Sequence, residues 1–510
     1  MNIRLSVLLV AMLLSISAVA QSSTPPADLD AYVHKAMVQW QVPGLAVAIV
    51  KDGKVVFARG YGVRELGKSG KVDADTLFTI GSVSKQFTVA ALGTLIAAGK
   101  LQWDAPVTGY LKDFDLASPY TTHNIMLSDL LSHRSGYCDP ESMWYTSDDT
   151  ADNVIQRLRY QTPDYGFRAH FCYNNTMYLA ASEFIPVITG ESWKDYVTQS
   201  LFTPLGMTRT DTTEAAVEAA SNAALPHAKI DNRVVVIKRY WANNMDVFAP
   251  VGGINSSVSD MSHWLEMLLA NGKYEGKTVV DPAVITTMET PQMIIPAHTW
   301  IGDWMRTQTP DSHFYAYGFG FMLQDYGPYK VVWHAGDING FATAMALVPS
   351  ERLGVIALSN MDQNRAPEGV VFHVLQAYLG LPYFNVSQAL YAARQKDDAK
   401  DKAAQDKLAA TRQNDARAPR PLTAYTGSYR DDFYGTAQVR EEEGHLVLQL
   451  GNPDFTGDLE PWHDNTFQVT WRDHYYGKNY LTFDLDAYGT PDKLSFALMP
   501  LHYQRAEAGN

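Results

Sequence analysis

The sequence predicts an α+β fold with a small all-β domain appended on its C-terminal side. The chain has 510 residues, more than one ordinary domain needs, and 46% of them are hydrophobic, enough for a large core. Strand-like runs occur at residues 45–61 and again at 315–359, and a mixture of helices and loops lies between them. A sheet whose first and last strands flank a helical middle is typical of the α+β class.

The first of these runs has the pattern of a β-hairpin. Two β-rich stretches, 45–50 and 55–61, are separated by a turn that contains Asp52-Gly53. Asp-Gly between two such stretches strongly favours a hairpin. A helical pattern precedes the hairpin at 27–40, and the segment 82–98 that follows it is apolar on nearly every side. A segment of that kind predicts a buried helix.

The last quarter of the chain changes character twice. Residues 387–419 are dominated by Ala, Lys, Asp, Gln and Arg, which predicts a solvated helix or a linker that Pro419 and Pro421 end. From Tyr425 onward, short alternating segments are separated by Gly, Asn, Asp and Pro. This pattern predicts a small antiparallel barrel or sandwich.

The first twenty residues have the pattern of an export signal. An apolar run from Leu5 to Ile16 follows a single arginine, and Ala18-Val19-Ala20 offers the small side chains that a signal peptidase accepts. The run is shorter than the ~20 apolar residues that span a bilayer, and no cysteine follows it for a lipid anchor. We therefore expect a periplasmic or secreted protein without a membrane anchor. The expected parts are a signal peptide (1–20), the α+β domain (21–386), a charged helical linker (387–419) and a β-barrel-like domain (420–510).

The net charge argues against nucleic acid as a partner, and the cysteine content argues against a disulfide scaffold or a zinc ribbon. The chain has 41 basic and 55 acidic residues, a formal net charge of −14, which disfavours binding to nucleic acid. Its two cysteines are too few for a disulfide scaffold or a zinc ribbon. No set of His, Cys or carboxylate residues has convincing metal-ligand spacing, so we expect neither a metal nor a cofactor. The expected partner is a small-molecule or peptide substrate.

A Ser-x-x-Lys motif opens the predicted buried helix. Ser82 and Lys85 are three residues apart, so their side chains share one helix face. An amine in a dry environment loses part of its preference for a proton and can act as a base for a hydroxyl. A serine cap and a lysine that reaches back to solvent are the structural alternative. Against that alternative, Lys85 lies in the most apolar helix that the sequence predicts.

Two further motifs follow along the chain. In Tyr173-Asn174-Asn175 the phenol can relay a proton, and the amide of Asn175 can hold both a lysine and a substrate. In His334-Ala335-Gly336, which follows a strand-like run, the glycine leaves room for a substrate to approach the backbone. The first of these motifs is not specific by itself, because a tyrosine that only packs explains it as well.

In this order and at these separations, the three motifs resemble those of the penicillin-recognising serine hydrolases. The similarity is closest to the branch of class C β-lactamases and DD-peptidases, and it extends over roughly residues 27–380. Connecting segments such as 130–136 and 204–207 agree with it. The resemblance implies a sheet domain beside an all-helical region with the site between them. It also implies that an appended barrel acts as a lid or as packing.

The resemblance further implies a role for each site residue. Ser82 would be the nucleophile, Lys85 and Tyr173 the acid–base pair, Asn175, His334 and Gly336 the residues that bind or position the substrate, and the backbone N–H groups of Ser82 and Asp337 the oxyanion hole. In the resembled fold the loops of Cys138 and Cys172 approach the same site, which predicts a disulfide between them in an oxidising compartment. Two separate buried thiols are the alternative.

The third motif departs from the β-lactamase pattern. β-Lactamases of this branch usually have Lys-Thr-Gly there, whose cation and hydroxyl bind the substrate carboxylate, whereas this chain has His334-Ala335-Gly336. The histidine resembles DD-peptidases, D-aminopeptidases and esterases. We therefore expect an exported serine hydrolase that cleaves esters or amides, including small peptides with D-residues, through an acyl-enzyme on Ser82. A β-lactamase or DD-carboxypeptidase acting on β-lactams or peptidoglycan peptides, and a non-catalytic penicillin-binding-like receptor or scaffold, are the open alternatives.

Overall fold

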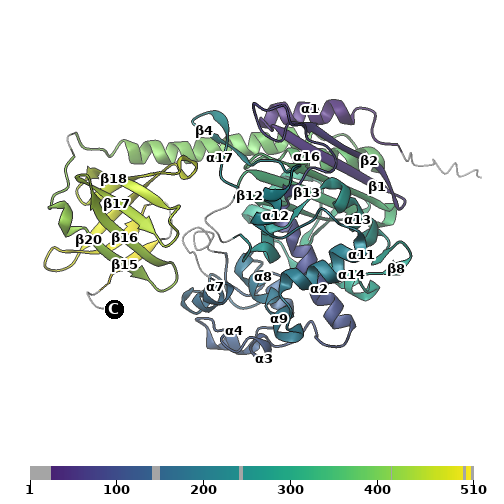
Figure 1. The fold of residues 1–510 in the computed structure, drawn as a ribbon, viewed down its shortest axis with the longest axis horizontal. Coiled ribbons are helices and arrows are strands. Elements are labelled where there is room, and N and C mark those ends of the chain that lie inside the picture. The colour runs from purple at the N-terminus through teal and green to yellow at the C-terminus, as the bar shows by residue number, and fades with distance from the viewer. Residues whose placement is uncertain (1–23, 140–149, 240–244, 415, 498–500, 507–510) are drawn as a thin grey trace, which may run out of the picture.

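The structure, a computed structural model, describes residues 24–139, 150–239, 245–414, 416–497 and 501–506 (Figure 1). The expected signal peptide at 1–20 lies outside the described residues. Within the described ranges, no helix combines the length and the apolar character that crossing a bilayer requires.

An eight-stranded antiparallel sheet forms the centre of the first domain, with the strand order β2-β1-β14-β13-β12-β11-β10-β9. Its strands are β1 (Gly44–Lys51), β2 (Lys54–Gly62), β9 (Met293–Ile294), β10 (Tyr315–Tyr317), β11 (Met322–Tyr326), β12 (Tyr329–Ile338), β13 (Phe341–Val348) and β14 (Leu353–Ser359). The N-terminal hairpin β1–β2 pairs with the last strand, with Leu45 opposite Ser359. Segments from the two ends of the domain therefore meet in one sheet, which confirms the α+β class.

Helices cover both faces of this sheet (Figure 1). On one face lie α1 (Leu29–Trp40), α16 (Ala366–Leu379) and the start of α17 (Val386–Ala409). On the other face lie α2 (Ser84–Ala97), α13 (Val258–Leu269) and a helical region. That region and its borders contain α3 (Val107–Tyr110), α4 (Pro119–Asn124), α5 (Leu127–Leu131), α7 (Ala151–Arg157), α8 (Asn175–Ser182), α9 (Phe184–Thr189), α10 (Trp193–Val197), α11 (Thr203–Leu205), α12 (Glu214–Ala219) and α14 (Pro282–Met288). Helix α15 (Trp300–Gln308) packs instead on the first face, against α17.

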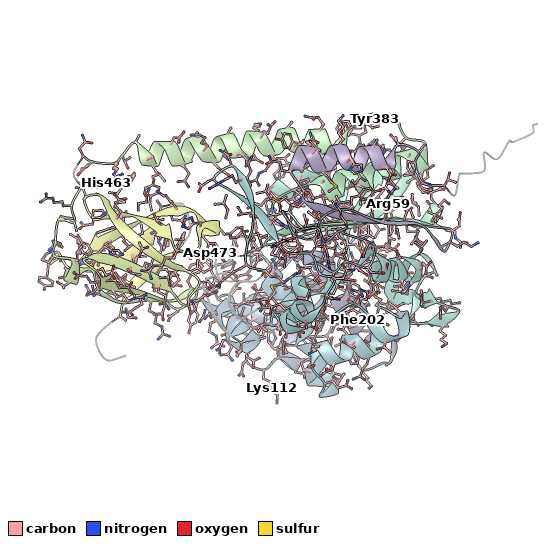
Figure 2. All side chains as sticks on the ribbon, turned by 45° about the horizontal axis from the view of Figure 1, so that its top comes forward. Arg59, Lys112, Phe202, Tyr383, His463 and Asp473 are labelled. Atoms are coloured by element: carbon pink, nitrogen blue, oxygen red, sulfur yellow. A yellow bond between two sulfur atoms is a disulfide. The ribbon has the colours of Figure 1, made fainter. Side chains whose placement is uncertain are left out.

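Helix α2 is buried because its sequence is apolar on nearly every side. It lies between the sheet and the helical region. Its Phe87 contacts Phe202, which is labelled in Figure 2, with the ring centroids 5.5 Å apart. Gly99, with a φ of +70°, follows the helix and lets the chain turn away. The nucleophile candidate therefore stands at the start of a helix that packing holds rigidly.

The C-terminal domain is a closed eight-stranded antiparallel barrel with its own apolar core, as the alternating sequence predicted. Its strands follow one another in chain order: β15 (Gly427–Asp431), β16 (Gly435–Glu442), β17 (His445–Leu450), β18 (Thr456–His463), β19 (Thr466–Trp471), β20 (Lys478–Leu485), β21 (Pro491–Phe496) and β22 (His502–Arg505). Helix α17, of 24 residues, leads to the barrel, and only its first turns are buried. The rest of α17 is charged and exposed to solvent, so it needs few apolar residues for packing.

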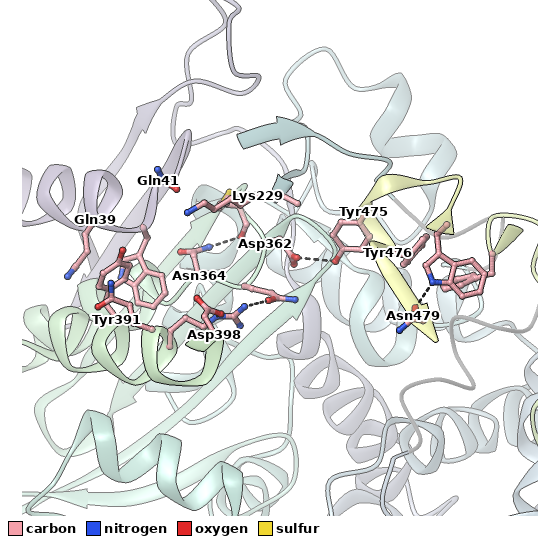
Figure 3. Close-up of a pocket in the computed structure, with 18 of the residues that line it drawn as sticks. Gln39, Gln41, Lys229, Asp362, Asn364, Tyr391, Asp398, Tyr475, Tyr476 and Asn479 are labelled. Atoms are coloured by element: carbon pink, nitrogen blue, oxygen red, sulfur yellow. Dashed lines mark hydrogen bonds and ion pairs between the residues drawn. The ribbon is translucent and has the colours of Figure 1, made fainter. Parts of the chain in front are cut away.

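The barrel touches the first domain at several points. The hydroxyl of Tyr475 donates to Oδ2 of Asp362 over 3.0 Å, and Nζ of Lys238 lies 2.7 Å from Oδ1 of Asp454. Phe433 packs into the core of the first domain. A cavity of about 670 Å³ lies beside these contacts and is lined by both domains and α17 (Figure 3). None of the predicted site residues lines this cavity.

Candidate active site

Ser82 lies in a short 3-10 turn, Gly81–Val83, that leads directly into α2. We expected it in the first turn of the helix, but α2 begins two residues later, at Ser84. The turn depends on Gly81, whose φ is +56°. A Cβ at Gly81 would lie 2.7 Å from the backbone N of Asp337, so only glycine lets the turn approach β12 this closely.

Lys85 is buried one helical turn after Ser82, and its ammonium group has three partners. Nζ lies 3.1 Å from Oγ of Ser82, 2.6 Å from Oδ1 of Asn175 and 2.9 Å from the carbonyl oxygen of Val251. Burial lowers the pKa of Lys85 to about 7, and the negative charge of Asp139 opposes this shift. The amine can therefore lose its proton near neutral pH, as a base for the Ser82 hydroxyl must.

The second motif immediately precedes α8. The side chain of Asn174 accepts a hydrogen bond from the N–H of Met177 and so caps the helix. The Lys85 ammonium lies 4.9 Å from the centre of the Tyr173 ring. Burial raises the pKa of the Tyr173 phenol well above its usual value, and a hydrogen bond with the Ser82 side chain only partly opposes that. Tyr173 therefore remains protonated beside Ser82.

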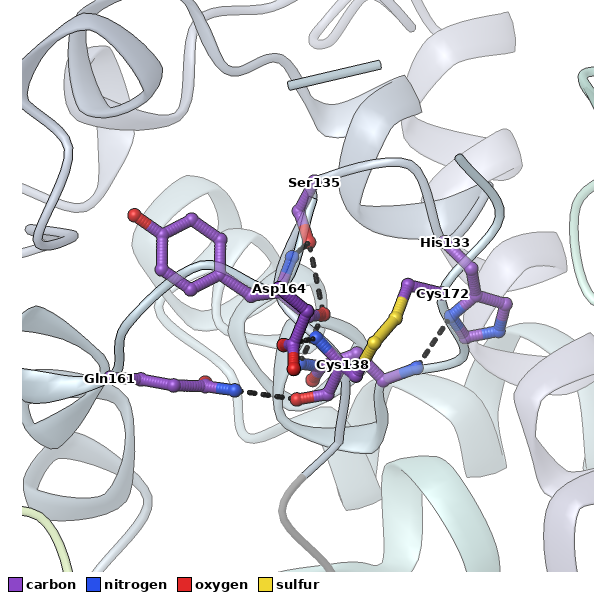
Figure 4. The surroundings of a disulfide bond; sticks show 8 residues. His133, Ser135, Cys138, Gln161, Asp164 and Cys172 are labelled. Carbon is purple, nitrogen blue, oxygen red and sulfur yellow. Dashed lines mark hydrogen bonds between the residues drawn. A yellow bond between two sulfur atoms is a disulfide. The ribbon is translucent and has the colours of Figure 1, made fainter. Parts of the chain in front are cut away.

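His133 holds the second motif in place (Figure 4). Its carbonyl accepts from the N–H of Cys172 over 2.8 Å, and its Nδ1 accepts from the N–H of Asn174 over 3.0 Å. The structure joins Cys138 to Cys172 in a disulfide, with the Cα atoms 4.9 Å apart. Two hydrogen bonds, one to the backbone and one to the imidazole of His133, and one covalent link thus fix the segment that carries Tyr173.

Sequence reasoning missed Asp139, which follows Cys138. Its Oδ2 accepts a hydrogen bond of 2.5 Å from Nδ2 of Asn175, and its backbone N–H donates to the carbonyl of Tyr173 over 2.9 Å. The amide of Asn175 is therefore held between Lys85 and Asp139. No sequence signal pointed to this contact, because Asp139 and Asn175 are 36 residues apart.

The third motif lies inside a strand and not at its end, since β12 continues to Ile338. The imidazole of His334 is buried, with 1% of the residue exposed. Its Nδ1 donates to the carbonyl of Ala335 over 2.5 Å, and its Nε2 accepts from the hydroxyl of Tyr317 over 3.0 Å. Burial lowers the pKa of His334 to about 3, so the ring is neutral. The buried ring therefore bonds to Tyr317 and to its own strand.

Gly336 and Asp337 bring the backbone of β12 against the nucleophile turn. A Cβ at Gly336 would lie 2.1 Å from the carbonyl oxygen of Ile80 and 3.0 Å from the N of Ser82. Only glycine permits this contact. The N–H groups of Ser82 and Asp337 are consequently close together, as an oxyanion hole requires.

Arg365, at the start of α16, is a second residue that sequence reasoning missed. Its Nη1 lies 2.5 Å from Oδ2 of Asp337 and 3.1 Å from Oε1 of the buried Glu368. Side chains alternate along β12, so Ala335 shares with Asp337 the face that packs on α16. A cation therefore does lie near the third motif, but two carboxylates already bind it.

One group of potential metal ligands is found in the described ranges, and it adjoins the site. It consists of Cys138, Asp164 and Cys172. The two sulfur atoms are bonded to each other, so they are not thiolates that could hold an ion.

Comparisons with known proteins agree with this fold. Residues 29–379 match the family described as Beta-lactamase, and residues 411–508 match a domain of unknown function, DUF3471. The unguisins hydrolase ungD of Aspergillus violaceofuscus is 27% identical over 456 residues, covering 83% of this chain and 78% of its own. The protein flp of Staphylococcus aureus is 25% identical over 348 residues, covering 67% of this chain and 64% of its own.

Two solved structures share the fold. The octameric penicillin-binding protein homologue from Pyrococcus abyssi has a TM-score of 0.60 and 21% identity, covering 94% of this chain and 98% of its own. The class C β-lactamase from Rhodobacter sphaeroides has a TM-score of 0.55 and 18% identity, covering 70% of this chain and 99% of its own. The first likeness extends over the barrel as well as the sheet domain.

Proposed function

Since the chain belongs to the β-lactamase family and is a serine hydrolase of that fold, we propose that it cleaves esters or amides through an acyl-enzyme on Ser82. The observation that carries this proposal is the set of short contacts around Lys85. Nζ contacts both Oγ of Ser82 and Oδ1 of Asn175, in a buried position where the lysine pKa falls to about 7. These are the conditions under which an amine activates a hydroxyl.

Acylation follows from this arrangement. Neutral Lys85 accepts the proton of the Ser82 hydroxyl as Oγ attacks the carbonyl carbon. The oxygen of the tetrahedral intermediate gains negative charge next to the N–H groups of Ser82 and Asp337. When the carbon–leaving-group bond breaks, the Tyr173 phenol protonates the leaving group, and Lys85 returns a proton to Tyr173. The acyl group is then esterified to Ser82.

Deacylation uses the same groups in reverse. A water molecule attacks the ester carbonyl and gives one proton to neutral Lys85. Lys85 then passes a proton to Oγ of Ser82 as the ester bond breaks. Departure of the acid regenerates the Ser82 hydroxyl. Because His133 and His334 are buried and neutral, they hold their neighbours in place without taking up these protons.

The substrates that we propose are small peptides, including those with D-residues, and simple esters. Ala335 offers no hydroxyl, and Arg365 is bound by Asp337 and Glu368, which supports a preference for substrates without a carboxylate beside the scissile bond. The apolar N-terminal segment supports export to the periplasm or medium. A cleaved signal peptide would appear as a mature N-terminus at Gln21 in intact-mass measurement.

One panel of substrates tests the proposal. Purified enzyme is given a chromogenic ester, a D-alanyl dipeptide and a cephalosporin side by side, and the turnover rates are compared with those of Ser82→Ala. We expect the ester or the peptide to be turned over fastest. Faster hydrolysis of the cephalosporin would favour the β-lactamase alternative. Binding of all three without turnover would favour a receptor.

A further inference from the structure

The cavity between the sheet domain and the barrel has walls from distant parts of the chain (Figure 3). One wall is a single face of α17, since the lining residues of this helix are three or four positions apart: Tyr391, Arg394, Gln395 and Asp398. The end of α1 and residues 361–364 form a second wall, and the barrel forms another. Its volume of about 670 Å³ lies within the range of about 300–1,000 Å³ that is usual for small-molecule sites.

Aromatic rings line the cavity on both the sheet-domain side and the barrel side (Figure 3). Trp40 and Tyr391 pack edge to face, with the ring centroids 5.1 Å apart. On the barrel side, the ring of Phe455 lies 4.2 Å from that of Tyr476 and 5.6 Å from that of Trp471. The face of an aromatic ring is apolar and carries partial negative charge. The cavity therefore suits a ligand that presents C–H groups to both walls.

Side-chain amides supply most of the polar lining. They belong to Gln39, Gln41, Gln363, Asn364, Gln395 and Asn479. An amide has both donors and an acceptor, so it pairs with a hydroxyl group in either role. Within the ranges that the structure describes, the side chains of Gln41 and Gln395 are exposed and make no hydrogen bond to the protein. These two amides are therefore open to a ligand.

The charged groups of the lining largely satisfy one another. Nε of Arg394 lies 2.7 Å from Oδ1 of Asp398, and its Nη2 donates to Oε1 of Gln363 over 2.5 Å. Asp362 accepts hydrogen bonds from both domains. Lys229 forms no ion pair in the described part of the chain, but its side chain is exposed to solvent. The walls thus contain two basic and two acidic side chains and favour a ligand without a net charge.

We propose that this cavity is a binding site for a neutral sugar, separate from the active site and shared by the two domains. A pyranose ring has C–H groups on its faces, which pack on aromatic rings, and hydroxyl groups around its edge, which amides match as donors and acceptors. A wholly apolar ligand would leave the amides without partners. The site is additional to the proposed serine hydrolase function and does not depend on it.

Calorimetric titration of the full-length enzyme with neutral disaccharides tests the ligand class. Cellobiose and maltose are the probes, and we expect a Kd of about 1 mM or lower for at least one of them. Two charged relatives of cellobiose are the comparison: cellobiuronic acid, which is an anion, and the glucosamine disaccharide, which is a cation. Both should bind at least about threefold more weakly than cellobiose, because the walls offer them no unpaired buried counter-charge.

Two variants on α17 test the location. Gln395→Ala removes one exposed amide and should raise the Kd about threefold to tenfold, the effect of one hydrogen bond. Tyr391→Ala removes an aromatic wall and should raise the Kd by about tenfold or more. Gln405→Ala is the matched control, because Gln405 lies on the same helix outside the cavity and should leave the Kd unchanged. Since Gln395 is exposed, its substitution decides the question even if Tyr391→Ala unfolds.

Covalent labelling of Ser82 by a fluorophosphonate separates the cavity from the active site. Labelled enzyme should bind the disaccharide with the same Kd as free enzyme, because none of the proposed catalytic residues lines the cavity. Loss of sugar binding on labelling, or wild-type affinity in Gln395→Ala and in folded Tyr391→Ala, would place the sugar elsewhere and overturn the assignment.

The ligand class is rejected if neither neutral disaccharide binds, or if a charged relative binds more tightly than cellobiose. Failure of the fluorophosphonate to label the enzyme has a different meaning, because it counts against the proposed serine hydrolase function alone. In that case the comparison of Gln395→Ala with Gln405→Ala still decides whether the cavity binds the sugar.

Discussion

The ammonium group of Lys85 lies 3.1 Å from the hydroxyl of Ser82, in a position that solvent does not reach. The lysine is one helical turn after the serine, so the backbone of the turn Gly81–Val83 and of α2 sets this distance. The partners that hold Nζ from the other side, Asn175 and Val251, come from distant parts of the chain. The contact therefore depends on the helix and on the packing around it.

Ser82→Ala should abolish turnover and covalent labelling while the fold remains intact, because only the attacking oxygen is lost. Lys85→Ala should reduce kcat almost as much, since groups that act as a unit do not contribute additively. Intact-mass spectrometry after incubation with a fluorophosphonate measures the labelling, and circular dichroism checks the fold. Wild-type turnover by Ser82→Ala would show that the nucleophile is another residue.

The activity should fall below neutral pH because Lys85 must be neutral to accept a proton. Its pKa is about 7, so kcat/KM should decrease about tenfold per pH unit well below that value. The Tyr173 phenol, whose pKa burial raises well above 10, should not titrate in the range up to pH 9, so the profile should be flat there. A pH–rate profile with p-nitrophenyl acetate measures this. An acid limb near pH 4 would point to a carboxylate as the base.

Features of the structure that lie within one segment of the chain were predictable from the sequence. Ser82 and Lys85 share a helix turn, and the Asp52-Gly53 turn lies in the predicted hairpin. The contacts between segments were not predictable: Asp139 reaches Asn175 over 36 residues and Arg365 reaches Asp337 over 28. A single sequence shows which residue types are present, but the register and packing of separate segments decide which side chains come into contact.

The third motif shows the same limit. We expected the motif to stand at the end of a strand-like run, where Gly336 would leave room for a substrate. In the structure β12 continues, and the missing Cβ makes room for Ile80 and Ser82. The glycine serves the contact between strand and nucleophile, a purpose that only the fold reveals.

Removal of the disulfide should destabilise the loops beside the nucleophile. Cys138 and Cys172 are 34 residues apart, and closing a loop of that length contributes on the order of 3 kcal/mol through the unfolded chain. The double variant Cys138→Ser/Cys172→Ser should therefore lose about that much in the free energy of unfolding, measured by urea titration. It should also lose kcat, because Cys172 precedes Tyr173. Reduced wild-type enzyme serves as the control and should behave alike.

Asp337→Asn should shift selectivity toward substrates with a carboxylate. The substitution keeps the backbone N–H in the proposed oxyanion hole and removes one of the two carboxylates that bind Arg365. The guanidinium then has donors available for a substrate carboxylate, and a charge-assisted bond of that kind contributes about 1.5–3 kcal/mol. The ratio of kcat/KM for a peptide acid to that for its methyl ester should rise about tenfold. Glu351→Gln, on the exposed turn after β13, is the control and should leave the ratio unchanged.

Truncation before Pro419 should leave the chemistry intact and change which substrates fit. The sheet domain and the barrel have separate apolar cores, and the residues around Ser82 all precede the cut. The barrel nevertheless contributes Phe433 to the first core and bonds to Asp362 through Tyr475, so the truncated chain should unfold at a lower temperature. Fluorophosphonate labelling of Ser82 should persist in it.

The dependence of kcat/KM on substrate size tests whether the barrel acts as a lid. Asp362, which accepts from Tyr475, also accepts a hydrogen bond from the N–H of Gly340 in the turn after β12, the strand that carries Gly336 and Asp337. Release of the barrel should therefore loosen the turn beside the proposed oxyanion hole. We expect the ratio of kcat/KM for a long-chain to a short-chain p-nitrophenyl ester to change severalfold in the truncated protein and, less strongly, in full-length Tyr475→Phe. An unchanged ratio in both proteins would mean that the barrel contributes only packing. Loss of labelling in a folded truncation would mean that the barrel supplies part of the site.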